Sequence, residues 1–206
     1  MTPKRGYTDN VDQYKKRVFS KIKGYLTGST LLDAGCGDGS DALIMLPYFK
    51  KICGFDIEKN SAWKKAPKKI SFKTAAAEKI PYKSLSFDTV YEKDMLHHCS
   101  DPFKAIKEMA RVAKKKVIII EANRYNPLFY INLTLLNNHQ HFTKKKFRAV
   151  VESAGLPFTI SRFSARVCPI NNRFIIDCFD SVENFLDRFP PYSPIIEYNL
   201  AVLEKK

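Results

Sequence analysis

The chain has 206 residues, of which 45% are hydrophobic and 27% are charged. This share of apolar residues is enough to bury one sizeable core and excludes a disordered tail or a fibre, so we expect a single domain over residues 1–206. The N-terminus is polar, and no apolar run approaches the ~20 residues that a membrane span needs. We therefore expect neither a signal peptide nor a transmembrane helix.

The charge is strongly basic, with 35 lysines and arginines against 21 acidic residues and a formal net charge of +14. Such a surplus permits anionic partners such as nucleic acid, phosphorylated glycans or an acidic membrane surface. Counted by thirds of the chain the surplus is spread out, so a solvated lysine-rich surface is the simpler interpretation. The five cysteines form no CxxC pair and no metal-ligand spacing, which predicts a reducing, cytoplasmic compartment and no metal site.

The first two thirds of the chain alternate between helical and strand patterns. Residues 10–27 are predicted as an amphipathic helix, because apolar residues recur at spacings of three and four. Asp101 before Pro102 predicts the start of another helix. Short apolar runs predict strands at Thr30–Ala34, Lys51–Ile57, Ile70–Thr74, Phe87–Tyr91 and Lys116–Glu121, and the continuous run Val117–Ile120 is the clearest sign of a buried parallel strand. This alternation predicts an α/β fold with right-handed crossovers.

The last third has a different rhythm. Thr143 is the predicted N-cap of a helix that ends near Ala154, and two final strands are predicted at Phe158–Phe163 and Ile195–Leu203. Two stretches, 122–142 and 164–194, match no regular element. Long excursions inside a compact domain are usually lids or binding loops, so we expect these two to hold the acceptor side of a site.

A glycine-rich turn follows the first predicted strand, in the sequence Leu31-Leu32-Asp33-Ala34-Gly35-Cys36-Gly37-Asp38-Gly39. A turn between strand and helix is where an open α/β sheet presents its ligand crevice. The dinucleotide fingerprint is GxGxxG with a pyrophosphate at the helix start. Here the spacing is GxGxG, and Asp33 and Asp38 are poor neighbours for a pyrophosphate. The two carboxylates suit a ligand that carries an ammonium group.

With these residues the sequence resembles the class I S-adenosylmethionine-dependent methyltransferases, and among them the group called type 11. The turn is similar to the family's first motif, and Phe87–Val90 followed by Leu96–His98 is similar to its fourth strand and following loop. The resemblance implies a three-layer, Rossmann-like, seven-stranded, mostly parallel sheet with helices on both faces and a lid insertion near the C-terminus. It implies a cofactor-binding half over residues 28–121.

The resemblance also implies S-adenosylmethionine as cofactor, with S-adenosylhomocysteine as product. Asp56 would take the ribose hydroxyls and Ile57 would pack on the adenine, while Lys93 falls near the methionine end. The residues implied to bind the cofactor are Asp33, Ala34, Gly35, Gly37, Asp56, Ile57, Ala77, Glu78 and Lys93.

His97 and His98 are the candidate catalytic residues, because they follow the fourth strand and histidine takes a proton readily near pH 7. A structural, loop-shaping role for the pair remains open. For His139 and His141 two roles remain open, contact with the substrate and ordinary packing in a loop. Glu121 ends the fifth predicted strand, and this position makes it a better candidate for a functional residue than an average surface glutamate.

The expected function is methyl transfer to a small-molecule or glycan-type acceptor, by a monomer or homodimer. Positioning of acceptor and methyl group alone can supply several kcal/mol, with ~7–11 kcal/mol as an upper range. Two alternatives remain open. The +14 charge invites RNA or protein methylation, although no RNA-binding module is evident, and a non-catalytic cofactor-binding subunit is the third possibility.

Overall fold

The structure, a computed structural model, describes residues 9–131, 135, 140–165 and 173–205. Seven strands form one sheet in the order β3-β2-β1-β4-β5-β7-β6, in which β7 is antiparallel to both of its neighbours and the other pairings are parallel. The strands are β1 (Thr30–Ala34), β2 (Lys51–Asp56), β3 (Ile70–Thr74), β4 (Phe87–Lys93), β5 (Ala113–Ala122), β6 (Phe158–Phe163) and β7 (Tyr198–Glu204). The strand order reverses at β1, between β2 and β4, which is where ligands bind in open α/β sheets.

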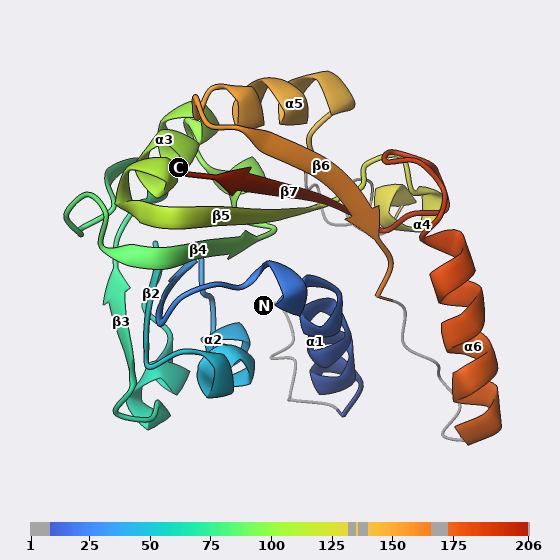
Figure 1. The fold of residues 1–206 in the computed structure, drawn as a ribbon, viewed down its shortest axis with the longest axis horizontal. Coiled ribbons are helices and arrows are strands. Elements are labelled where there is room, and N and C mark those ends of the chain that lie inside the picture. Colours follow the sequence, from blue (N-terminus) through green and yellow to red (C-terminus); the bar gives the residue numbers. More distant parts are fainter. Residues whose placement is uncertain (1–8, 132–134, 136–139, 166–172, 206) are drawn as a thin grey trace.

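Helices cover both faces of the sheet (Figure 1). Helices α1 and α2 lie on one face, and α3 and α5 lie on the other, whereas α4 and α6 stand beside the carboxyl ends of the parallel strands. The helices are α1 (Asp9–Ile22), α2 (Ser40–Met45), α3 (Pro102–Val112), α4 (Pro127–Phe129), α5 (Lys144–Glu152) and α6 (Arg173–Leu186). Short 3-10 helices are η1 (Lys23–Tyr25), η2 (Leu46–Tyr48), η3 (Ser61–Lys65), η4 (Ala77–Lys79) and η5 (Leu96–His98).

The core has two halves because successive strand side chains point to opposite faces of the sheet. Leu32 and Val90 pack with α3 and α5, whereas their neighbours Leu31 and Tyr91 pack with α1 and α2. Both faces of the central strands are therefore buried, which explains the continuous apolar run Val117–Ile120 in β5.

The predicted sheet and its helices are confirmed. Asp101 accepts a hydrogen bond from the backbone N–H of Lys104 at the start of α3, and Thr143 accepts one from Lys146 at the start of α5, as N-caps do. The last strand begins at Tyr198 rather than Ile195. The carbonyl of Ile196 accepts hydrogen bonds from the side-chain amides of Asn123 and Asn126, and is thus withdrawn from strand pairing.

The segment 164–194, expected without regular structure, contains α6. Its apolar residues recur at helical spacing, a signal that the flanking prolines obscured. Ion pairs tie α6 to α1: Arg17 pairs with Asp180, and Lys21 Nζ lies 2.6 Å from Asp187 Oδ2. No helix in the described ranges combines the length and hydropathy needed to cross a bilayer. His139, Arg166 and Cys168 lie outside the described residues.

Candidate functional site

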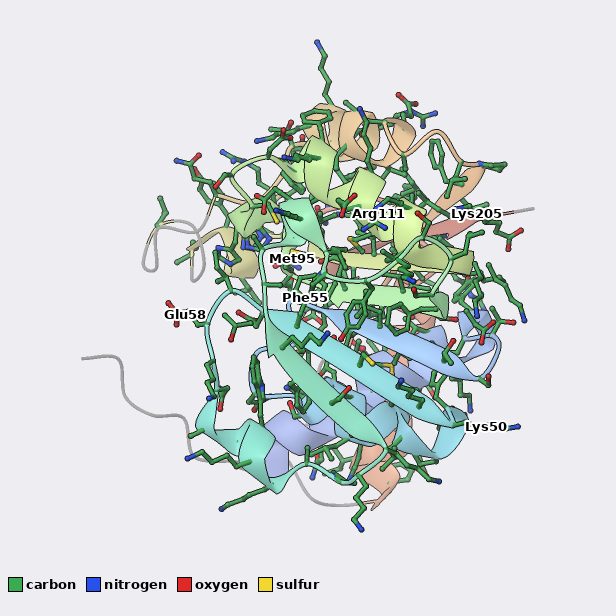
Figure 2. The ribbon with its side chains drawn as sticks, turned by 90° about the vertical axis from the view of Figure 1, so that its left-hand side faces the viewer. Lys50, Phe55, Glu58, Met95, Arg111 and Lys205 are labelled. Carbon is green, nitrogen blue, oxygen red and sulfur yellow. The ribbon has the colours of Figure 1, made fainter. Side chains whose placement is uncertain are left out.

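A cavity of about 580 Å³, here called the large cavity, opens at the carboxyl ends of β1, β2 and β4. Its lining residues are Gly35, Phe55, Asp56, Ile57, Ala75, Ala76, Ala77, Glu78, Asp94, Met95, His98, Cys99, Ser100, Asp101 and Lys104. Figure 2 labels two of them: Phe55 comes from β2 and Met95 from the turn after β4, and they lie near each other at the sheet edge. The large cavity therefore collects five of the predicted cofactor-binding residues, namely Gly35, Asp56, Ile57, Ala77 and Glu78, together with His98.

A second cavity of about 160 Å³, the small cavity, adjoins the first, and Gly35 lines both. Its lining residues are Lys15, Asp33, Gly35, Cys36, Gly37, Asp38, Asp41, Tyr91 and Lys93. Three further predicted residues, Asp33, Gly37 and Lys93, thus meet there. Ala34 lines neither cavity, because its side chain is fully buried in the core beside α3.

Two of the three glycines of the turn, Gly35 and Gly37, face different surroundings. Gly35 has φ +70°, and a Cβ placed on it would lie 2.3 Å from Met95 Cγ, so a side chain there would displace Met95. Gly37 has φ +52°, and a Cβ on it would meet no atom within 4 Å. A side chain at Gly37 would therefore point into open space at the small cavity. Both positive φ values favour glycine over any other residue.

Asp56 ends β2 and points across to the turn. Its Oδ2 accepts a hydrogen bond of 2.8 Å from the backbone N–H of Gly37, and Oδ1 accepts one of 3.2 Å from Glu58. Trp63 closes the same corner by donating its indole N–H to the carbonyl of Gly37 at 2.9 Å. The carboxylate thus sits where the two cavities meet.

The small cavity holds both acids and bases. The Asp33 side chain is buried, and burial followed by the charge of Asp41 raises the pKa of its carboxyl well above the usual range. Within the described part of the chain, Asp33 Oδ2 has no hydrogen-bond partner. A ligand ammonium would supply one, so the residues present fit the amino-acid end of S-adenosylmethionine.

Two lysines complement these acids. Lys15 of α1 lies 3.2 Å from Asp41 Oδ1 and 3.5 Å from Asp38 Oδ1. Burial alone would lower the pKa of Lys93, but the surrounding charges, Asp41 first, raise it, so the amine stays protonated. The small cavity can therefore meet a ligand that carries one ammonium and one carboxylate.

His97 lies behind the large cavity, and His98 lies in its wall. The His97 side chain is only 1% exposed, and its Nδ1 lies 2.6 Å from Oε2 of Glu121. Oε1 of Glu121 accepts the backbone N–H of His97 at 3.2 Å. Burial lowers the pKa of His97 and, together with the charge of Asp94, raises that of Glu121. The two imidazole rings of the pair are 4.0 Å apart between centroids.

His141 joins this group from the segment before α5, with its ring centroid 4.3 Å from that of His97. Donor atoms of His97, Glu121 and His141 all lie within 4.8 Å of one another, so the fold assembles metal-ligand residue types that the sequence spacing did not indicate. Glu92 is fully buried nearby and accepts the backbone N–H of Met95 at 3.0 Å. It thereby holds the turn that leads to the histidines.

Several cavity residues escaped the sequence analysis, among them Lys15, Met95 and Lys104. Lys15 belongs to α1, far from the glycine-rich turn in sequence, and Met95 and Lys104 are ordinary residue types at their positions. The available signal was the Glu92-Lys93-Asp94-Met95 stretch, which directly follows the core of β4 at the crevice edge.

Part of the chain matches a known protein family. Residues 32–120 match the methyltransferase domain family. An uncharacterised Bacillus subtilis methyltransferase, YcgJ, is 28% identical over 144 residues, which cover 62% of this chain and 57% of YcgJ. Its crystal structure shares the fold, with a TM-score of 0.65 at 19% identity and coverage of 92% of this chain and 98% of that one.

Two relatives with named substrates differ in the acceptor. The 27-O-demethylrifamycin SV methyltransferase of Amycolatopsis mediterranei is 28% identical over 53% of this chain and 46% of its own length. A tRNA U34 carboxymethyltransferase of Campylobacter curvus is 32% identical over 41% of this chain and 30% of its own length. The chain thus spans about half or less of the length of these two relatives, and the similarity leaves the acceptor open.

Proposed function

Since the chain belongs to the class I S-adenosylmethionine-dependent methyltransferases, we propose that it methylates a small-molecule or glycan-type acceptor at the wall of the large cavity that carries His98. S-adenosylmethionine, when bound, supplies an activated methyl group on a sulfonium. The remaining work of the protein is to hold the acceptor in line and dry, which can supply several kcal/mol.

The observation that carries this proposal is the pair of joined cavities. The small cavity offers Asp33 and Lys93 for the charged end of the cofactor, and the large cavity offers Asp56 and Ile57 for the nucleoside end. Gly35 lines both, so the two cavities adjoin at this residue. Glu78 and Ala77 close the far side of the large cavity.

We assign the contact with the acceptor to His98 and the support of His98 to His97 and Glu121. His98 lines the cavity and is exposed, whereas His97 is buried and held by the carboxyl of Glu121 at two points. His97 is thus a positioning residue. An acceptor hydroxyl would give its proton to the imidazole of His98, while an amine acceptor would need no base.

The segments 122–142 and 164–194 are proposed to enclose the acceptor. The second carries exposed aromatic side chains, with Phe174 75% and Phe185 57% exposed, which excludes them from the core. Asn123 of the first segment donates a hydrogen bond of 2.8 Å to the carbonyl of Ser193 near the end of the second, and thereby links the two segments.

Methyl transfer from labelled S-adenosylmethionine to pools of hydroxylated and amine-bearing small molecules tests the proposal. Label should appear in a small-molecule product with the wild-type protein and fall at least tenfold with His98→Ala. Label in RNA or protein alone would refute the acceptor class. Label in no pool, with S-adenosylhomocysteine still bound, would favour a non-catalytic cofactor-binding subunit.

A further inference from the structure

Ten exposed lysines between residues 50 and 83 form what we call the lysine surface. Its members are Lys50, Lys51, Lys59, Lys64, Lys65, Lys68, Lys69, Lys73, Lys79 and Lys83. The same stretch contains only three acidic residues, so it carries a net charge of +7, half of the chain's +14. Division of the chain into thirds hid this concentration, because a boundary at residue 70 cuts through it.

These lysines are not neutralised by neighbours. Among the described residues, none of the ten takes part in an ion pair, whereas lysines elsewhere do, such as Lys15 with Asp41 and Lys21 with Asp187. Asp56 and Glu78 accept hydrogen bonds from backbone N–H groups instead. The lysine surface therefore presents uncompensated positive charge to the solvent.

The fold gathers these residues at one side of the sheet. β3 is the edge strand, and Lys51 directly precedes the pairing of Ile52 with Ile70, beside Lys69. Figure 2 looks onto this side, where Lys50 projects outward at the start of β2. Strand residues rise ~3.3 Å each, so Lys69, directly before β3, and Lys73, within it, are separated by ~13 Å. An extended anionic chain that runs along this edge can therefore contact both lysines.

Aromatic side chains lie between the lysines. Tyr48, two residues before Lys50, is 54% exposed. Trp63 is partly exposed and stacks on Phe72 with ring centroids 5.2 Å apart. The Lys73 amine lies 4.7 Å above the ring of Tyr82. Tyr48 and Trp63, which are exposed in part, offer surface on which bases can stack, and this adds to lysines that follow the phosphate backbone of a single strand.

We propose that the lysine surface binds single-stranded RNA through its phosphates. The surface is built from an edge strand and 3-10 helices of three to five residues, so it has no amphipathic helix that could lie in a bilayer. The exposed residues Ser61 and Thr74 lie among the lysines, and their hydroxyl groups can pair with the ribose 2′-hydroxyl, which DNA lacks. Binding there does not depend on which molecule accepts the methyl group.

Fluorescence anisotropy with a labelled 12-nucleotide single-stranded RNA tests the proposal, with DNA of the same sequence and anionic phosphatidylglycerol vesicles as parallel arms. If four phosphates are neutralised, RNA affinity should fall roughly 50-fold between 50 and 200 mM salt. The double variant Lys64→Glu/Lys65→Glu should weaken RNA binding at least tenfold and flatten the salt dependence, since fewer counterions are released.

The matched control is Lys107→Glu/Lys145→Glu, which makes the same charge change on exposed residues of α3 and α5. It should bind RNA within threefold of the wild type. Equal losses in both variants would overturn the proposal, because they would show a response to net charge alone. Absence of RNA binding, tighter binding of DNA, or binding to vesicles without RNA would overturn it as well. Binding of S-adenosylhomocysteine should persist in both variants, so this test is separate from that of the methyl transfer.

Discussion

Glu121 holds His97 at two points, with Oε2 2.6 Å from Nδ1 and Oε1 accepting the backbone N–H at 3.2 Å. The contact joins the end of β5 to the turn after β4, across the edge of the sheet where the large cavity opens. It fixes the ring and the backbone of His97 together, and the ring of His98 lies against it. Glu121 and His97 therefore fix the orientation of the His98 ring in the wall of the large cavity.

The first prediction concerns this contact. Glu121→Gln keeps the shape but weakens the hold on His97, so turnover should fall about tenfold or more while affinity for S-adenosylhomocysteine stays the same. The raised pKa of Glu121 favours the folded state when the carboxyl is protonated, and this contribution disappears as pH rises above about 4.5. Relative to the wild type, the variant should therefore gain stability from pH 4.5 to 8. Wild-type turnover would contradict the assignment.

The second prediction compares two glycines. Gly35→Ala places a methyl group against Met95, so it should lower the melting temperature by several degrees. The side chain of Gly37→Val points into open space, so the variant should lose only the stability that a non-glycine residue loses at a positive φ. Cofactor binding should be abolished, because this side chain occupies the small cavity. Thermal melts and calorimetric titration of both variants decide. Full cofactor affinity in Gly37→Val would place the cofactor elsewhere.

The third prediction tests the lid. Phe174 is 75% exposed, whereas Phe179 is partly buried beneath the Arg17 guanidinium, 5.8 Å away. Phe174→Ser should therefore leave the melting temperature nearly unchanged and reduce turnover. Phe179→Ser should additionally loosen α6 from α1. A core position would cost ~3 kcal/mol or more, so a large loss of stability in Phe174→Ser would rule out a lid.

The fourth prediction concerns Asp88, whose Oδ2 accepts hydrogen bonds from the backbone N–H groups of Ser29 and Thr30. These bonds outweigh the effect of burial and lower the pKa of the carboxyl to about 2. A carboxyl whose pKa is lower in the folded than in the unfolded state stabilises the fold fully at pH values above its unfolded-state pKa. This stabilisation is lost as the pH falls through its folded-state pKa. Asp88→Asn should therefore cost about 1–2 kcal/mol at pH 7 and progressively less between pH 4 and 2. Denaturant titrations at several pH values measure this, and a constant difference would contradict it.

The order of strands and helices was predictable because the strands contain short apolar runs and because α3 and α5 begin at local caps, Asp101 and Thr143. The glycine-rich turn and Asp56 were predictable for a similar reason, since their roles follow from position at strand ends. Contacts between distant segments were not predictable. The pairing of Glu121 with His97 spans 24 residues, and Lys15 reaches the turn only because α1 folds back over it.

The concentration of charge illustrates the same limit. The lysines near residue 51 and those near residue 69 are separated in sequence and are brought together by the pairing of β2 with β3. Similarly, the aromatic residues of 164–194 could be assigned to core or surface only after the position of α6 was known.

The central claim is that the two cavities bind S-adenosylmethionine, and calorimetric titration with its product tests it most directly. S-adenosylhomocysteine should bind the wild type, and Asp56→Ala should bind at least tenfold more weakly, because each hydrogen bond to a charged acceptor contributes about 1.5–3 kcal/mol. The fluorescence of Trp63, the only tryptophan in the chain, should change on binding, since its indole contacts Gly37. NAD and NADP should not bind. Binding of either dinucleotide in place of S-adenosylhomocysteine, or wild-type affinity in Asp56→Ala, would contradict the account.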